Sequence, residues 1–430
     1  MCAACRDAAT EGGCDGFVGS PEIAEQDSAL VFEHRRLEPL KHGGVLVDIQ
    51  PLLGADRDVW IGLTLDGRLW LLDLDRRAVR LIARLPDRVL DPARAMAMVV
   101  SRDGRLAAVV NVRGVAGVVL DLETGRTTIE LRRDEYHVEQ CKFPLAFIER
   151  AGRQLLAYGR DWNRLDVVDA RTGEPLTDRI SPGYVRDAPQ PDHYLEYFHC
   201  GLAVSPNQRY VVDNGWVWHP SGIVTAWSID RWLDDNVWES EDGASRRELC
   251  VRSYYWDGPL CWLDDAHLAV WGLGDDDPLL PAVRIFDVRS GTEDRWFPGP
   301  QGDLVFDRVL IALDGERGSS VWNLENGARL LHDAAPAPLR YHPSAKTFLS
   351  FGQDPELTTS RLCGHAAEWN RGVVADLAAA IARDHSFQDL PVLGDALESA
   401  GCSDVDLLAH CQHPGPHGGR CWVIDRLRGR

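Results

Sequence analysis

The residues best suited to metal chemistry lie close together near the end of the chain. Zinc is bound in proteins by four Cys or His side chains in tetrahedral geometry. Six such residues stand near one another here: Cys402, His410, Cys411, His413, His417 and Cys421. Their spacing matches no zinc finger or knuckle. The sequence leaves two readings open, a zinc site built from Cys402, His410, His417 and Cys421, or packed cysteines beside a loop of histidines. We expect the second, and no cofactor.

Another group of thiols lies at the start, where Cys2 and Cys5 form Cys-x-x-Cys and Cys14 follows. Such a pair binds zinc or cycles between thiol and disulfide only with a partner pair or a helix start nearby. Neighbouring glycines favour a flexible leader over residues 1–28. The leader lacks the basic and apolar regions of a secretory signal. Since the chain has 11 cysteines, an odd number, we expect a reduced, cytoplasmic protein.

Sequence motifs of common enzymes do not occur. There is no Gly-x-Ser-x-Gly, no His-Glu-x-x-His and no phosphate-binding glycine loop. The acidic runs at 264–265 and 275–277 lack the spacing of a calcium loop, so exposed loop charge is the alternative to a calcium site. With 66 acidic and 46 basic residues, the net charge of −20 argues against a nucleic-acid partner. No apolar run reaches the length of about 18 residues needed to span a membrane.

Aromatic residues interleaved with Asp and His in the middle of the chain are suited to recognition. The candidate binding residues are Trp162, Tyr184, His193, Tyr194, Trp216, Trp218, His219, Tyr254, Tyr255 and Trp256. On the loops of a rigid scaffold, such side chains form a binding surface. The same side chains could instead pack between strands. The fold that positions them decides between the two.

A repeated pattern predicts that fold. Apolar runs ending in Asp or Asn recur at intervals of roughly 50 residues, a period typical of repeat proteins. They end at Asp73, Asp121, Asp169, Asp230, Asp287 and Asn323. Glycines 125, 173 and 291 in the following turns permit the positive φ that a tight hairpin requires. Each unit also has an upstream hairpin, as at residues 101–106, and helices are almost absent before residue 366. Four short strands per unit predict an all-β chain, a β-propeller.

We expect seven four-stranded blades, with six or eight as alternatives. The predicted limits are 42–87, 94–133, 139–180, 197–255, 256–298, 301–334 and 336–364. The last segment offers only three strands, so residues 29–37 are predicted to supply its fourth strand and to close the ring. This closure would remove the open sheet edges that invite aggregation. The propeller is therefore assigned to residues 29–364.

The repeats resemble a degenerate WD-repeat propeller over roughly residues 29–364. Leu-Asp, Val-Asp, Ile-Asp and Phe-Asp stand where that family has Trp-Asp, and its Gly-His pair is absent. Residues 390–425 are similar to a short C-terminal module found on many otherwise unrelated proteins of planctomycetes and related bacteria. The first resemblance implies an architecture, and the second implies a bacterial origin.

A helical module is predicted over residues 365–430. Trp369, Val373, Leu377 and Ile381 recur every four residues, as on one helix face. Residues 393–400 and 404–410 predict two further short helices, the last capped by Ser403. Because the module carries many apolar residues for its size, we expect it to pack against the outside of the ring.

On a propeller, the connections from second to third strand and from one blade to the next emerge on the same face, which would gather the aromatic loops. We therefore expect a non-catalytic scaffold that binds a protein or peptide partner on this aromatic face. The alternatives are a propeller enzyme, such as a hydrolase, lactonase or lyase with a site in the central channel, and a small-molecule sensor. The predicted innermost strands are mostly apolar and offer no ring of carboxylates, which favours the scaffold. The sequence leaves the oligomeric state open.

Overall fold

The computed structural model describes residues 23–28, 30–38, 40, 43–53, 57–180, 187–274, 279–351, 356–364, 372–400, 402, 404–413 and 421–428. The leader cysteines Cys2, Cys5 and Cys14 lie outside this part. The chain divides into two compact units. One contains Met1–Gln26 and Arg35–Thr359, and the other contains Asp27–His34 and Ser360–Arg430.

The strands of the described residues form seven sheets, six of four strands and one of three. The first three sheets contain β2 (Leu46–Pro51), β3 (Val59–Thr64), β4 (Arg68–Asp73) and β5 (Ala78–Arg84); β6 (Met96–Val100), β7 (Leu106–Asn111), β8 (Ala116–Asp121) and β9 (Thr127–Arg132); and β10 (Leu145–Arg150), β11 (Arg153–Asp161) and β12 (Arg164–Asp169).

The remaining sheets follow in chain order. They contain β13 (Phe198–Val204), β14 (Tyr210–Val217), β15 (Ser221–Ser228) and β16 (Arg247–Ser253); β17 (Leu260–Trp262), β18 (His267–Leu273), β19 (Leu280–Asp287) and β20 (Thr292–Pro298); β21 (Asp303–Asp307), β22 (Val309–Asp314), β23 (Gly318–Trp322) and β24 (Arg329–Asp333); and β25 (Arg340–His342), β26 (Thr347–Phe351) and β27 (Leu357–Gly364) with β1 (Leu30–Arg36).

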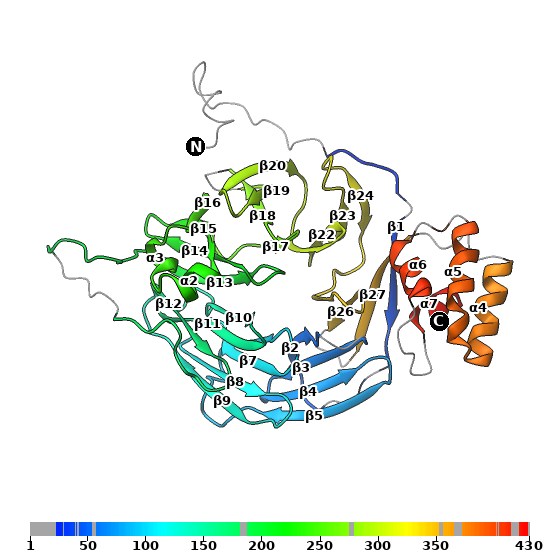
Figure 1. Cartoon of the computed structure of the whole chain (residues 1–430), viewed down its shortest axis with the longest axis horizontal. Helices are drawn as coiled ribbons and strands as arrows, with labels where there is room; N and C mark the ends of the chain where they lie inside the picture. Colours follow the sequence, from blue (N-terminus) through cyan, green and yellow to red (C-terminus); the bar gives the residue numbers. More distant parts are fainter. Residues whose placement is uncertain are drawn as a thin grey trace, which may run out of the picture. The chain divides into compact units, whose positions relative to one another are not determined.

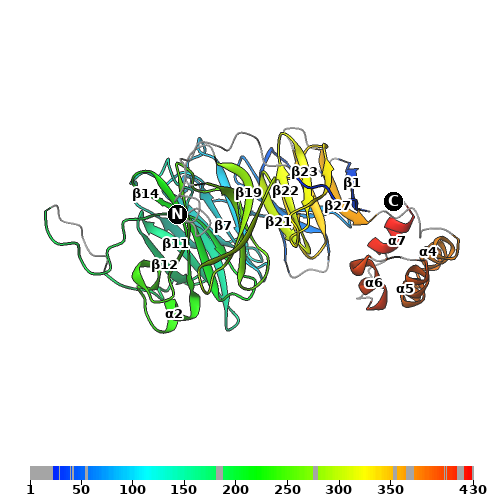
Figure 2. The same ribbon diagram turned by 90° about the horizontal axis from the view of Figure 1, so that it is seen from above.

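The sheets follow one another around a central axis, with β2, β10 and β17 on the inside and β5, β9 and β20 on the outside (Figure 1). Figure 2 shows the same blades from the side. The predicted seven-bladed β-propeller is confirmed. Successive strands of the first six blades pair antiparallel, as in β2–β3 and β3–β4. Connections from second to third strand and between blades therefore emerge on one side, which we call the loop face.

Blade three departs from the predicted four strands. After β12, only an isolated bridge between Val168 and Pro175 continues the sheet. The helix α2 (Ile229–Asp234), followed by α3 (Glu239–Asp242), was not predicted. Trp232 of α2 is fully buried in one cluster with Leu165 and Val167 of β12. This helix supplies apolar cover where the regular fourth strand is missing.

The repeated Asp and Asn residues cap the turns that follow the third strands. Asp121 accepts hydrogen bonds from the backbone N–H groups of residues 123 and 124, and Asp169 does the same for residues 171 and 172. The glycines that complete these two turns have φ near +70°, a conformation open to Gly at little cost. Asp230 is the exception, because it lies in the first turn of α2.

Apolar clusters lie between consecutive blades. The cluster between blades one and two joins Ile61 and Leu69 to Met98 and Val109, all nearly or fully buried. Similar clusters join blades two and three, three and four, four and five, five and six, and seven and one. A blade thus buries its faces against its neighbours, as expected for a repeat protein.

The ring closes through a strand from the start of the chain. The last sheet has the order β1-β27-β26-β25, so the predicted closure by residues 29–37 is confirmed. The backbone N–H of Leu37 donates to the carbonyl of Leu357 at 2.8 Å.

Inside the ring, Asp48 of β2 joins three blades. Its buried carboxylate accepts hydrogen bonds from the N–H groups of Ile49 and Met98, each at 2.8 Å, and pairs with Arg340 of β25 at 3.0 Å.

The C-terminal helices have a core of their own. They are α4 (Val373–Asp384), α5 (Leu390–Ser399), α6 (Val405–Gln412) and α7 (Trp422–Leu427), with a short 3₁₀ helix at Phe387–Asp389. The predicted face of the first helix is wrong at Val373, which is 68% exposed, whereas Val374, Ala378 and Ile381 are buried. Trp369 lies outside the described residues. The third helix is capped by Asp404 rather than Ser403.

The prediction that these helices pack against the ring stays a prediction, and so do the boundaries of the leader, propeller and module. No helix in the described part of the chain is both long and apolar enough to cross a membrane.

Candidate functional site

An aromatic cluster occupies the loop face over blades three and four. Its members come from four connections and two strands: Tyr136, His137, Trp162, Phe198, Trp216, Trp218 and Trp256. Four of them, Trp162, Trp216, Trp218 and Trp256, were predicted from the sequence. The cluster forms because the β9–β10, β11–β12, β14–β15 and β16–β17 connections all emerge on this face.

The centre of the cluster is a buried stack. The Phe198 and Trp216 rings are parallel with centroids 4.2 Å apart, and Trp256 stacks on the other side of Trp216 at 5.0 Å. Phe198 is 0% exposed and Trp216 is 2% exposed. Stacking at these separations adds to the free energy of apolar burial. Trp216 therefore packs in the interior, which is the alternative that the sequence left open for these aromatic residues.

The rim of the cluster is open to solvent. Tyr136 is 48% exposed and Trp218 is 39% exposed. Between them lies His137, whose ring meets the Trp218 ring edge-on at 4.9 Å and the Tyr136 ring at 4.4 Å. Tyr136 is itself stacked over Phe198 at 5.7 Å. Each rim ring is thus held by a ring beneath it while part of its surface remains free for a partner.

Two buried cysteines lie beside the stack. The indole N–H of Trp216 donates to the Cys141 sulfur at 2.9 Å, and Cys200 belongs to the same buried cluster. A hydrogen bond with Cys200, aided by that from Trp216, lowers the pKa of the Cys141 thiol against the effect of burial. Burial raises the pKa of Cys200 well above its usual range. These thiols contribute to packing and to the orientation of Trp216.

The β9–β10 connection, which carries Tyr136 and His137, is fixed by polar contacts. The guanidinium of Arg133 donates to the carbonyls of Gly114 and Cys141 at 2.7 and 3.1 Å. The indole N–H of Trp256 donates to the carbonyl of Gln140 at 2.9 Å. The cluster therefore stands on a preorganised loop, and little conformational entropy need be lost there on binding.

An acidic residue completes this anchoring. Asp257 accepts a hydrogen bond from the N–H of Lys142 at 3.0 Å, and burial raises the pKa of its carboxyl group.

Other predicted residues lie apart from the cluster. His193 stacks on Trp238 at 4.6 Å and pairs with Asp242 of α3 at 2.9 Å. Tyr255 lies 5.1 Å from the ring of Trp271 and under the guanidinium of Arg252. Tyr194, His219 and Tyr254 are not members of the aromatic cluster as defined above. His219 and Tyr254 are exposed. Tyr184 lies outside the described residues.

Tyr136, His137 and Phe198 were missed. Tyr136 and His137 lie in a connection between blades, so the rule that selected the other loop aromatics applies equally to them. Phe198 gave no such signal because it lies inside an apolar strand, β13.

Two buried acidic groups of the first and second strands have structural partners. Asp213 of β14 contacts the imidazole of His199 at 2.5 Å and accepts a hydrogen bond from the N–H of Cys200 at 3.1 Å. Asp48 joins three blades as described above. Within the described residues, no three His, Cys, Asp or Glu side chains are grouped so as to hold a metal ion.

The candidate zinc ligands of the C-terminal module are partly brought together. His410 lies 3.3 Å from the sulfur of Cys421, and Cys402, Cys411 and Cys421 are buried in the core of the helices. Burial raises the pKa of Cys402 and Cys421, and that of Cys411 to about 12. His417 lies outside the described residues.

The chain was also compared with known proteins. The β-propeller domain of Cps50 (Swd1) from Myceliophteria thermophila is similar in structure, with a TM-score of 0.50 and 11% identity over 77% of this chain and 100% of that domain. A chain of the mitotic checkpoint complex has a TM-score of 0.48 and 12% identity over 81% of this chain and 98% of that one. No protein-family model matches the sequence, and no curated protein matches it significantly.

Proposed function

We propose that this propeller is a non-catalytic scaffold that binds a protein or peptide partner on its loop face, through the rim of the aromatic cluster. The observation that carries the proposal is the exposed pair Tyr136 and Trp218 above a buried stack. Aromatic side chains that are both rigid and exposed are frequent anchors of protein interfaces. The neighbour with a TM-score of 0.50 is described as a β-propeller domain, a fold that is compatible with such a role.

The inner strands favour a scaffold over an enzyme. A catalytic carboxylate needs a free oxygen within reach of a substrate. Here, the carboxylates of Asp48 and Asp213 already accept hydrogen bonds from backbone N–H groups and contact Arg340 and His199. These contacts give both carboxylates a structural role, which is to hold neighbouring strands and blades together, and no catalytic role is needed to account for them.

A selection experiment tests the proposed face. A library of random dodecapeptides displayed on phage is panned on the purified chain, and the recovered peptides are synthesised for affinity measurement. Tyr136→Ala and Trp218→Ala should each weaken binding about tenfold or more, as anchor residues do. Trp296→Ala is the matched control, because Trp296 is 42% exposed on the outer strand β20.

The controls decide the interpretation. Melting curves of the three variants must match the unmodified chain, which we expect because each ring is substantially exposed. Peptides that bind all three variants equally well, or failure to recover any peptide, would contradict the proposal.

A further inference from the structure

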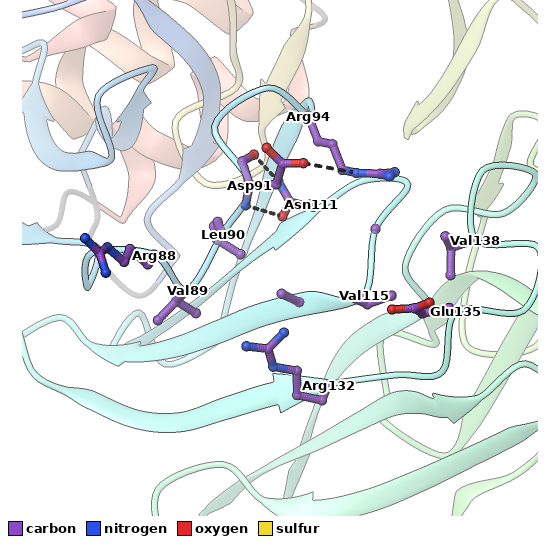
Figure 3. A pocket seen from close by; sticks show the side chains of 12 residues that line it. Arg88, Val89, Leu90, Asp91, Arg94, Asn111, Val115, Arg132, Glu135 and Val138 are labelled. Carbon is purple, nitrogen blue, oxygen red and sulfur yellow. Dashed lines mark hydrogen bonds and ion pairs between the residues drawn. The ribbon is translucent and has the colours of Figure 1, made fainter.

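A pocket opens on the loop face beside the aromatic cluster, over blade two. It has a volume of about 490 Å³ and is bounded by the β5–β6, β7–β8 and β9–β10 connections (Figure 3). Its apolar lining includes Val89, Val115 and Val138. Figure 3 shows Arg88 at one side, Glu135 at the other and Arg132 between them.

The polar groups on one wall of the pocket already have partners within the chain. Asn111 accepts a hydrogen bond from the N–H of Asp91 and donates one to its carbonyl, both at 2.9 Å. Arg94 pairs with the carboxylate of Asp91 at 3.4 Å and also donates to the carbonyl of Arg113. These groups hold the β5–β6 connection against blade two and have little capacity left for a ligand.

Two of the arginines that line the pocket have no partner in the part of the chain that the structure describes. Within the described residues, the guanidinium groups of Arg88 and Arg132 have neither an ion-pair nor a hydrogen-bond partner, and both residues are exposed. Only Glu135 opposes them among the groups that line the pocket without a partner. In a chain of net charge −20, a pocket with two free arginines and one free carboxylate is a local positive site.

The lining suits a side chain with an apolar stem and an anionic end. Valines can cover the methylene groups of such a side chain, while a guanidinium binds a carboxylate through two parallel N–H donors. Glutamate and aspartate in a peptide have this chemistry.

The pocket and the aromatic cluster share one wall. Glu135 and Val138 line the pocket, whereas Tyr136 and His137, between them in the sequence, belong to the cluster. The contacts of Arg133 and Trp256 fix this segment. Because an extended peptide advances about 3.3 Å per residue, one short peptide can place neighbouring side chains on both sides of the wall.

We propose that the pocket between Arg88 and Arg132 binds an Asp or Glu side chain of a peptide whose apolar residues contact Tyr136 and Trp218. This proposal rests on the proposed function and names the chemistry of the partner. Charge complementarity supports it, since the rest of this acidic chain repels acidic peptides and the pocket supplies the local attraction.

The test uses the dodecapeptides recovered on the unmodified chain. They should be enriched in Asp and Glu, and replacement of the selected Glu by Gln should weaken binding about tenfold, with replacement by Lys weakening it further. The variant Arg88→Glu/Arg132→Glu should lose affinity for the Glu peptide and gain affinity for the Lys peptide. The matched control is Arg80→Glu/Arg105→Glu, which makes the same change of charge at exposed sites outside the pocket.

The outcomes separate the two proposals. Peptides that depend on Tyr136 and Trp218, yet show no acidic enrichment or bind equally well with Gln, overturn the pocket and leave the aromatic face intact. An equal loss of affinity in the control variant also overturns the pocket, because it indicates a general effect of charge. Acid-dependent peptides that need Arg88 and Arg132 but neither Tyr136 nor Trp218 support the acid-binding pocket, but they overturn the proposed aromatic face and the placement of the peptide's apolar residues on it.

Discussion

Replacement of Asp48 should destabilise the propeller far more than replacement of its partner Arg340. The Asp48 side chain is 3% exposed. It accepts hydrogen bonds from the N–H of Ile49 in its own blade and the N–H of Met98 in blade two, and it pairs with the guanidinium of Arg340 in blade seven. Asp48→Ala leaves a buried N–H without an acceptor and removes charge-assisted hydrogen bonds. We expect a loss of about 3–5 kcal/mol in the free energy of unfolding, as for other broken buried charge networks.

Arg340→Ala should cost less, about 1–2 kcal/mol, because Arg340 is the partly exposed member of the pair. The Arg340 side chain is 39% exposed, and Asp48 keeps both backbone donors in this variant. Asp48→Asn keeps the shape and one acceptor oxygen, so it should fall between the two.

Denaturant unfolding measures the difference as a shift of the midpoint at constant slope. Asp103→Ala serves as the control, because Asp103 is an exposed turn residue that accepts hydrogen bonds from Ser101 and Arg105 of one blade only. If Asp48→Ala costs no more than Arg340→Ala or Asp103→Ala, the argument that Asp48 joins the blades is refuted.

Three further predictions concern closure, pH and metal. Deletion of residues 1–40 removes β1 and should abolish cooperative unfolding, and an unchanged melting curve would contradict the closing role of this strand. A hydrogen bond from Arg289 lowers the pKa of Asp287 to about 2. The contribution of the Asp287 carboxylate to the free energy of unfolding should therefore be complete above about pH 4 and should be lost as the pH falls toward about 2. The stability difference between the unmodified chain and Asp287→Asn should therefore shrink in acid, and a difference independent of pH would refute this. A chelator should leave the melting temperature and the proteolysis of the C-terminal helices unchanged, because Cys402, Cys411 and Cys421 are packed in the apolar core of these helices; one bound metal per chain by elemental analysis would contradict it.

The blades could be predicted because their signals are local. Each hairpin is specified by an apolar run, an Asp and a Gly that lie within a few positions of one another, as at Asp121 and Gly125. In the structure, Asp121 accepts a hydrogen bond within the turn and Gly125 has a positive φ, which explains why these residues recur. The closing strand was predictable from the strand count alone. The irregular edge of blade three was not, because α2, which covers it, lies about 60 residues away.

The candidate site was only partly predictable. Trp216 and Trp218 are two positions apart, yet one is 2% and the other 39% exposed, because Trp216 lies within β14 and Trp218 beyond its end. The pairing of Asp48 with Arg340 joins residues 292 positions apart and leaves no local trace. In the first C-terminal helix, the buried face is displaced by one residue at its start, since Val373 is the first helical residue and Val374 turns inward.

The strand β1 has a consequence for synthesis of the chain. Among the propeller strands β1 is made before all others and its partner β27 after all others; the side-chain contact between His34 and Ser360, for example, spans 326 positions. During translation, β1 remains unpaired until β27 has been synthesised, while the other blades can assemble in chain order. Its sequence suits this delay, because Glu33, His34, Arg35 and Arg36 are charged or polar and exposed, and such residues hinder pairing with another chain. Completion of the ring therefore depends on release of the C-terminal region from the ribosome, and a ribosome stalled before residue 357 holds an open propeller.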